Sequence, residues 1–324
     1  MNLLQRLLIA FLIVLNYWAV SAQETFPIYS DYLSDNVYLI HPAAAGVGTC
    51  GKVRLTGRKQ WIGVPDAPEL QTLSFHSKFT DKAALGFVLF NDKNGYHSQK
   101  GLQATYAYHV ELGDGRIFEQ LSFGLSATAV HNQSDQRTFF GDRAVQQLIE
   151  STGYFNADVG VAYHRGGFSS YFTVKNILLS AKNNLNNSLE PLNLRNYILN
   201  TGYYFSYKNK IEFEPSIMVQ YREATGDLIS DINFKTYKNL KKAQLWATLS
   251  YRRTFDKSAT ENLQYLTPIV GVNYQRFMVS YTYTKQLGNI VFADANYHQL
   301  TLGVNIFCKE RRATACPNIN GSLF

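Results

Sequence analysis

The sequence of 324 residues is poor in cysteine, methionine and tryptophan, with three of each. Three cysteines are too few for a disulfide-dense scaffold, and the spacing of Cys50, Cys308 and Cys316 fits no metal site. After residue 22 there is no apolar run long enough to cross a membrane as a helix, and the mean hydropathy is −0.19. These absences exclude a disulfide scaffold and a helical membrane protein.

The short motifs of common enzymes are also missing. There is no Gly-x-Ser-x-Gly, no phosphate-cradling glycine loop and no His-Glu metal motif. His131, Asn132 and Ser134 lie in one short segment, which does not supply the opposed geometry that a nucleophile and its base need. We therefore expect no catalytic residues, no cofactor and no metal.

Residues 1–22 have the pattern of a secretory signal peptide. Arg6 gives the basic start, Leu7 to Leu15 the apolar core, and Val20-Ser21-Ala22 a small-residue cleavage site before Gln23. The alternative is an uncleaved anchor, but no second apolar segment follows. The cleavage point has no cysteine, so nothing indicates a lipoprotein. We expect a mature chain outside the cytoplasm.

The charge balance is basic. Arg6 is the one charged residue of the signal, so its removal lowers the formal net charge from +7 to +6. The cations fall on one strand face and in turns, not in a basic helix or an aromatic RNA-binding platform. We expect no nucleic-acid partner.

Aromatic residues are abundant, with 22 Tyr and 21 Phe. The stretch 52–79 shows how they are used, because apolar and polar residues alternate along both of its limbs. A strand sends successive side chains to opposite faces, so each limb has one apolar and one polar face. Alternating strands rich in Tyr and Phe are typical of outer-membrane barrels, whose aromatic girdles lie at the two membrane interfaces.

The alternation recurs in segments of about ten residues, the length that a tilted membrane strand needs. Fourteen segments are expected as strands: 52–60, 70–79, 83–91, 100–112, 117–130, 156–165, 168–175, 195–206, 211–222, 228–237, 242–252, 267–274, 277–284 and 297–307.

The connectors between these segments alternate in length. Short, turn-like connectors contain Thr80-Asp-Lys, Gly113-Asp-Gly, Arg165-Gly-Gly, Tyr207-Lys-Asn-Lys, Lys238-Asn-Leu-Lys and Gln275-Arg. The others are mostly longer: 61–69, 92–99, 131–155, 176–194, 223–227, 253–266 and 285–296. Bacterial barrels have short periplasmic turns and long external loops. A soluble all-β protein is the alternative fold, but it has no reason to alternate in this way.

We therefore predict an all-β transmembrane antiparallel barrel of about 14 strands over residues 50–308. Residues 23–49 are irregular and lie in the periplasm or in the lumen, and 309–324 form a periplasmic tail. An even strand number lets the first and last strands pair, so that no edge faces lipid. Cys50 and Cys308 then meet at one rim, and Cys50 is expected to bond to Cys308 or Cys316. The alternative is three unpaired cysteines.

One strand face is strongly basic and is expected to point into the lumen, through Lys52, Arg54, Arg58, His76 and Lys78. Two interpretations stay open: a wall that attracts an anionic ligand or acidic peptide, or a lumen balanced by carboxylates such as Glu111, Glu212, Glu214 and Asp231. Two long loops are candidate partner sites or simply solvated loops. The first, 131–155, has a possible short helix over 144–150, and the second, 176–194, is rich in Asn.

Several short motifs occur in an order that resembles the PorP/SprF family of the type IX secretion system. They are His41-Pro-Ala-Ala-Ala-Gly46, Arg58-Lys-Gln-Trp61, Ala67-Pro68, Gly86 with Asn91-Asp92 and Gly95, the segment 156–176, and Cys316-Pro317. The family's first motif is Asn-Pro-Ala-Tyr-Ala-Gly, so His41 and Ala44 depart from it. The likeness spans nearly the whole expected mature chain.

The resemblance implies a non-enzymatic outer-membrane barrel. It would work with periplasmic ring and lipoprotein components and help to export or anchor a large surface adhesin, including gliding adhesins, through the adhesin's C-terminal domain. Residues expected to bind partners are Arg58, Gln60, Trp61, Pro65, Ala67 and Pro68 at the outer end of the first strand, and His41, Pro42 and Gly46. The alternative function is a passive porin whose basic lumen conducts anions.

Overall fold

The computed structural model describes residues 32–61, 63, 66–113, 117–137, 149–178, 195–207, 211–223, 225–255, 262–287 and 296–309. Within these ranges the regular structure is almost all β-strand, and the two helices, η1 (Val37–Leu39) and η2 (Pro42–Ala44), are single 3-10 turns. No helix in the described part is long and apolar enough to cross a membrane. The predicted signal peptide lies outside the described residues.

Fifteen strands follow the two helical turns. They are β1 (Gly51–Gln60), β2 (Glu69–Lys78), β3 (Ala83–Asn94), β4 (His97–Glu111), β5 (Glu119–Asp135), β6 (Ile149–Arg165), β7 (Phe168–Lys175), β8 (Asn196–Tyr203), β9 (Phe205–Tyr207), β10 (Ile211–Arg222), β11 (Leu228–Asn239), β12 (Ala243–Phe255), β13 (Gln264–Tyr274), β14 (Phe277–Leu287) and β15 (Tyr297–Ile306).

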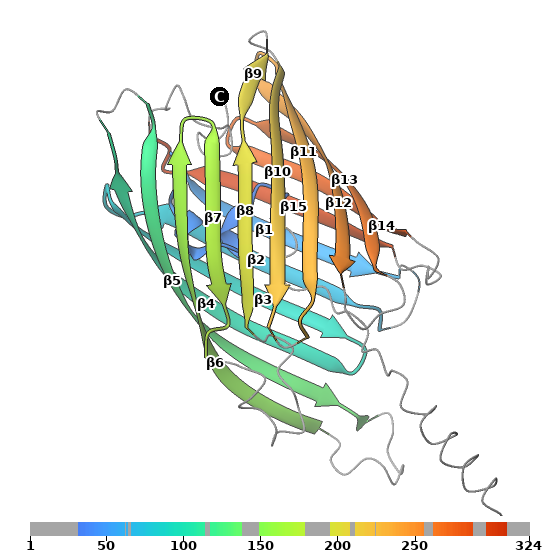
Figure 1. Ribbon diagram of the computed structural model, residues 1–324. Helices are drawn as coiled ribbons and strands as arrows, with labels where there is room; N and C mark the ends of the chain where they lie inside the picture. The colour runs from blue at the N-terminus through green and yellow to red at the C-terminus, as the bar shows by residue number, and fades with distance from the viewer. Residues whose placement is uncertain are drawn as a thin grey trace, which may run out of the picture.

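These strands close into a barrel (Figure 1). Each pairs antiparallel with its neighbour, and β1 pairs with β15 from Gly51↔Ile306 to Gln60↔Tyr297. β8 and β9 both pair with β10, so they are one strand interrupted at Tyr204. The result is a closed 14-stranded antiparallel barrel, and the predicted fold class is confirmed.

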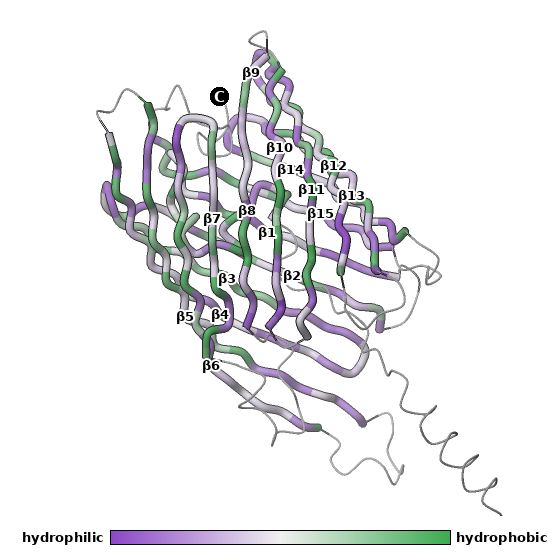
Figure 2. Tube along the Cα trace, in the orientation of Figure 1, coloured by the Kyte–Doolittle hydropathy of each residue, from purple (hydrophilic) through white to green (hydrophobic). Residues whose placement is uncertain are grey.

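The strands have an apolar outer face and a polar inner face, as their alternation predicted. On β1, Leu55 is 49% exposed, whereas Arg54 on the inner face is 1% exposed. Figure 2 shows hydrophobic and hydrophilic residues alternating along the strands. Lipid can solvate the apolar outer face, while the inner face must satisfy its polar groups within the barrel.

The connectors define two ends of the barrel. The short-turn end carries the β2–β3, β6–β7, β11–β12 and β13–β14 turns, and the long-loop end carries the connectors that follow β1, β5, β7 and β12. Cys50 and Cys308 lie at the short-turn end and form a disulfide across the β1–β15 seam. Cys316 lies outside the described residues.

Two predicted loops at the long-loop end are shorter than expected. The prediction of a loop over residues 92–99 is wrong, because β3 and β4 continue to a two-residue turn at Gly95-Tyr96. Gly95 has a φ of +58°, which glycine adopts without steric cost and which suits a tight hairpin turn. The 131–155 loop is also shorter, since β5 reaches Asp135 and β6 begins at Ile149. The end of the predicted helix over 144–150 is therefore strand, and its start lies outside the described residues.

Candidate functional site

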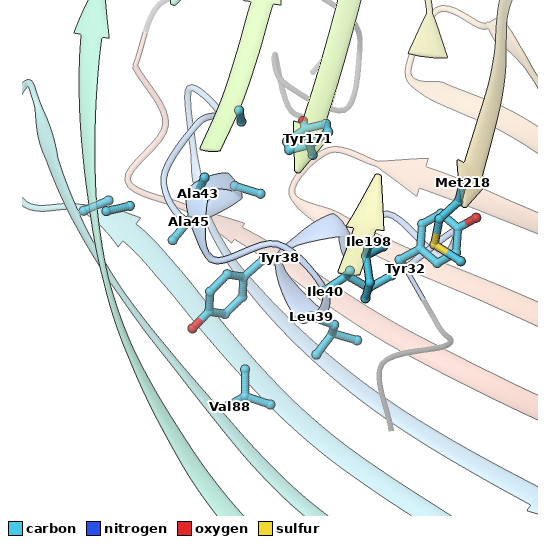
Figure 3. Close-up of a cluster of buried hydrophobic side chains, with 14 residues drawn as sticks. Tyr32, Tyr38, Leu39, Ile40, Ala43, Ala45, Val88, Tyr171, Ile198 and Met218 are labelled. Carbon is cyan, nitrogen blue, oxygen red and sulfur yellow. The ribbon is translucent and has the colours of Figure 1, made fainter. Parts of the chain in front are cut away.

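Residues 32–50, here called the plug, lie inside the barrel and contact strands on all sides of the lumen. Figure 3 shows this segment with the side chains packed around it. Its apolar side chains form a cluster with small or apolar residues of the wall, including Ala84, Val88, Ala107, Ile198 and Met218. Its polar groups form hydrogen bonds with residues of the barrel wall, namely Asp231, Thr282, Ser74, Thr105, Thr173, His76 and His109.

Close approach of the plug to the wall depends on glycine. A Cβ at Gly124 of β5 would lie 2.3 Å from the backbone nitrogen of Ala43. A Cβ at Gly86 of β3 would lie 2.4 Å from the Tyr38 hydroxyl oxygen. Both distances are far inside van der Waals contact, so these two positions admit the plug because they have no side chain.

Asp35 of the plug pairs with two cations on the basic face of β1. Its Oδ2 accepts from Arg54 Nη2 at 3.1 Å and lies 3.6 Å from Lys52 Nζ. Burial by itself raises the pKa of the Asp35 carboxyl, but the charges of Lys52, Lys235 and Arg54 outweigh burial, so the pKa lies below its usual value. One carboxylate of the plug therefore offsets part of the positive charge of the basic wall predicted from the sequence.

His41 is fully buried where the plug meets β7. Its Nδ1 lies 2.8 Å from Thr173 Oγ1, and its ring stacks on Tyr171 with centroids 5.1 Å apart. Nε2 has no hydrogen-bond partner among the described residues. Burial, with a further contribution from the charge of Lys175, lowers the pKa of His41 to about 3. The imidazole is thus neutral at physiological pH.

A second ion pair holds the first described residue of the plug. Arg252 of β12 donates to both oxygens of Asp231 on β11, at 2.7 and 2.8 Å. Tyr32 donates its hydroxyl to Asp231 at 3.1 Å and accepts from Asn233 at 2.9 Å. Burial is the main reason that the pKa of Tyr32 lies well above its usual value. Asp231, which the sequence placed among the lumen carboxylates, is thus buried and paired.

Two cavities remain beside the plug. One is lined by residues near the long-loop ends of β12, β13 and β15, such as Arg252, Tyr265 and Tyr297. The other is lined by residues near the short-turn ends of β7 and β10, such as Phe168 and Glu214. Leu33 lines both cavities, so the plug separates them.

The other predicted partner-binding residues lie at the long-loop end. Arg58 is buried on the inner face with its guanidinium 5.2 Å from the centre of the Tyr297 ring. Gln60 donates its backbone N–H to Pro68 O at 3.0 Å, which closes the connector after β1. Trp61 is half-buried with a φ of +47°, and Ala67 is buried. Pro65 lies outside the described residues.

The structure therefore separates the predicted site residues into two groups. His41, Pro42 and Gly46 lie in the plug, where Gly46 N donates to His76 Nδ1, and the 58–68 group forms the rim. Asp35, Tyr32 and Tyr38 hold the plug but were not selected from the sequence. The one available signal was the surplus of cations on β1, which called for a carboxylate somewhere in the lumen.

A family model described as type IX secretion system membrane protein PorP/SprF matches residues 21–304. No curated protein is significantly similar to the chain in sequence. Similar solved structures include the CymD monoaromatic hydrocarbon channel, with a TM-score of 0.44 and 9% identity over 82% of this chain and 90% of that chain. The Acinetobacter baumannii outer membrane protein Omp33 has a TM-score of 0.39 and 10% identity over 81% and 100%.

The family match covers almost all of the barrel and the plug. The two-faced strands, the closed seam and the motifs from His41 to Pro68 lie within it. The chain belongs to the PorP/SprF family of type IX secretion system membrane proteins, and it is located in the outer membrane.

Proposed function

We propose that the protein is a non-enzymatic component of the type IX system that helps to export a large adhesin-type protein, or to hold it at the cell surface, through that protein's C-terminal domain. Family membership supports a role in type IX secretion. By the usual orientation of bacterial barrels, the long-loop end faces outward and the short-turn end faces the periplasm. The secreted protein would dock outside, and ring and lipoprotein components would dock inside.

The main support for the proposal is that the plug fills the lumen of the barrel. The plug crosses the barrel, and its polar groups bond to the wall on opposite sides, at Ser74 of β2, Thr173 of β7 and Thr282 of β14. A barrel filled in this way offers its two ends, rather than a wide pore, to other molecules. Asp35 also offsets part of the positive charge on the basic face of β1, which weighs against an anion-conducting porin.

The proposal assigns the outer docking surface to the long-loop rim. Trp61, Ala67 and Pro68 belong to the connector that closes the β1–β2 hairpin there. Lys309, at the opposite end, donates its backbone N–H to Thr49 O at 2.9 Å, so the tail that follows it begins at the periplasmic rim. The two ends could therefore engage different partners of the secretion machine.

The test is detergent extraction of native membranes followed by affinity purification of the barrel and identification of copurifying proteins. A large secreted surface protein should copurify with the wild type. Trp61→Ala should reduce that recovery, whereas Phe277→Ala, which removes an exposed aromatic residue at the short-turn end, should not. If no secreted protein copurifies and the purified barrel conducts steadily, the porin function is favoured instead.

A further inference from the structure

In the part of the chain that the structure describes, the outer part of β6 pairs with a strand on one side only. β5 pairs with β6 along its whole length, from Asp135↔Ile149 to Glu119↔Arg165. β7 pairs with β6 only from Val159 to Arg165. Beyond that pairing, Ile177 N donates to Ala157 O at 2.9 Å, and Leu178 N donates to Asn156 Oδ1 at 3.2 Å. Among the described residues nothing pairs with the same side of residues 149–155, so these residues form an open strand edge at the long-loop end.

The direction of the open backbone groups follows from that last bond. In a strand the N–H and C=O of one residue point to the same side, and successive residues point to opposite sides. Because Ala157 O points toward β7, the backbone groups of Ile149, Ser151, Gly153 and Phe155 point to the same side. Among the described residues none bonds to these groups, so the edge presents alternating donors and acceptors over seven residues.

This edge lies on a part of the sheet that extends beyond its neighbours. β5 and β6 have 17 residues each, whereas their neighbours β4 and β7 have 15 and 8. About 9–11 residues suffice to cross the membrane. An open edge is not tolerated in hydrocarbon, so the unpaired part of β6 belongs in water above the membrane. Figure 1 shows β5 and β6 continuing past the ends of β7 and β8.

The edge also lacks the usual protection against strand pairing. Natural edges are commonly blocked by lysine, proline or a bulge. Residues 149–156 include no lysine and no proline, and Glu150 is their one charged residue. Ile149 is 46% exposed and Phe155 is 77% exposed, so exposed apolar side chains lie beside the open backbone groups.

We propose that the edge Ile149–Phe155 accepts an extended strand of the secreted surface protein by β-addition. This inference rests on the proposed function and adds a specific contact, at the same long-loop end, to the docking surface proposed there. In β-addition, backbone hydrogen bonds supply affinity and alternate side chains supply specificity. The edge fits a strand with apolar residues beside Ile149 and Phe155 and a basic residue opposite Glu150 on the other face.

Other occupants suit the edge less well. The chain's own segment 179–194 follows β7, but it contains five asparagines and Pro191, residues that disfavour strands. A second copy of the protein would bring another Glu150 to the interface and no cation from residues 149–156. An acidic edge without a basic residue complements a strand that carries Lys or Arg better than it complements itself.

Ser151→Pro tests the inference with little disturbance of the barrel. Proline lacks the backbone N–H, and at residue 151 that group points to the open edge and not to β5. We expect an unchanged heat-modifiable band on SDS gels and a loss of about tenfold or more in recovered surface protein, because the backbone hydrogen bond is lost and the proline ring also blocks the approach of the added strand. Ser151→Ala keeps the N–H and should bind like the wild type.

Hydrogen exchange gives a readout that needs no variant. In the purified barrel alone, the amides of Ser151, Gly153 and Phe155 should exchange rapidly, and they should become protected in the complex with the surface protein. Slow exchange in the isolated monomer, or in a dimer of the barrel, would show that the edge is already covered and would overturn the inference.

The two proposals fail differently. If the surface protein does not copurify with the wild type, the proposed function fails. If it copurifies equally well with the wild type and with folded Ser151→Pro, the proposed function stands and docking at the β6 edge is refuted.

Discussion

Asp35 is the counter-ion of a buried arginine, although it belongs to no strand. Arg54, 1% exposed, pairs with the Asp35 carboxylate and also donates to the neutral oxygens of Val53, Val304 and Asn305. A buried cation costs several kcal/mol unless it is paired and hydrogen-bonded. The plug therefore stabilises β1 electrostatically as well as by packing.

We predict that Asp35→Asn loosens the plug. The amide keeps the size of the side chain but removes the charge that compensates Lys52 and Arg54. Breaking a buried pair typically costs about 3–5 kcal/mol. Chymotrypsin cleavage in the plug, which contains Tyr38 and Leu39, should become much faster, and this can be measured by mass spectrometry of the folded barrel.

Asp66→Asn is the matched control, because Asp66 pairs with Lys93 on the surface, where both side chains are more than half exposed. Such exposed pairs contribute little, so cleavage of the plug should stay at the wild-type rate. Equal cleavage rates for the Asp35 and Asp66 variants would contradict the role of Asp35.

The plug is an element whose attachment should depend on pH, because His41 is buried in its neutral form. The pKa of His41 is lowered from about 6.5 in the released plug to about 3 in the bound one. Above pH 6.5 neither state binds the proton, so attachment is unaffected. Between pH 6.5 and 3 only the released plug takes up the proton, so attachment weakens as the pH falls.

At pH 5 the loss from His41 alone should be on the order of 2 kcal/mol. His41→Asn introduces the residue usual at this place in the family motif and removes the titration. We expect hydrogen exchange of plug amides to accelerate between pH 7 and pH 5 in the wild type, after correction for intrinsic rates, and to accelerate less in His41→Asn. An identical pH dependence in both proteins would show that His41 is not the responsible group.

For the whole molecule, the occupied lumen predicts a barrel that conducts little. In planar bilayers the wild type should show no large steady conductance, because the plug packs against the wall around the lumen. Deleting residues 32–48 should open the lumen, and the open state should prefer anions, since Lys52 and Arg54 then lose Asp35. Steady wild-type conductance equal to that of the deletion variant would contradict this expectation.

Much of the barrel could be predicted because its physical signals are local. The period of two on β1 and β14 and the turn residues at Gln275-Arg276 are readable in short windows. The Cys50–Cys308 disulfide was one of the alternatives that the sequence left open, because it joins two residues at opposite ends of the chain. The outer ends of β5 and β6 were harder to predict, because both faces of a strand are exposed to water beyond the membrane and apolar residues then need not alternate with polar ones. Ile149–Phe155 therefore carries a weaker alternation and was assigned to a loop.

The interruption at Tyr204 was also hidden in the sequence. The predicted strand 195–206 continues its alternation there, but Tyr204 N donates to Gly167 O of the β6–β7 turn at 2.8 Å, and the pairing with β7 ends at Tyr203. Such a break depends on a neighbouring strand that ends early. Information of that kind is absent from the segment itself.

Side-chain periodicity and local turn chemistry are enough to predict the barrel, its approximate number of strands and the polarity of its two faces. The ordered motifs point to its family. Three features are visible in the folded molecule alone: residues 32–50 fill the lumen, Asp35 is the counter-ion of Arg54, and residues 149–155 of β6 have no described neighbour on the β7 side. Those outcomes depend on contacts between residues far apart in the chain, and an irregular segment has no periodicity that could reveal its partners.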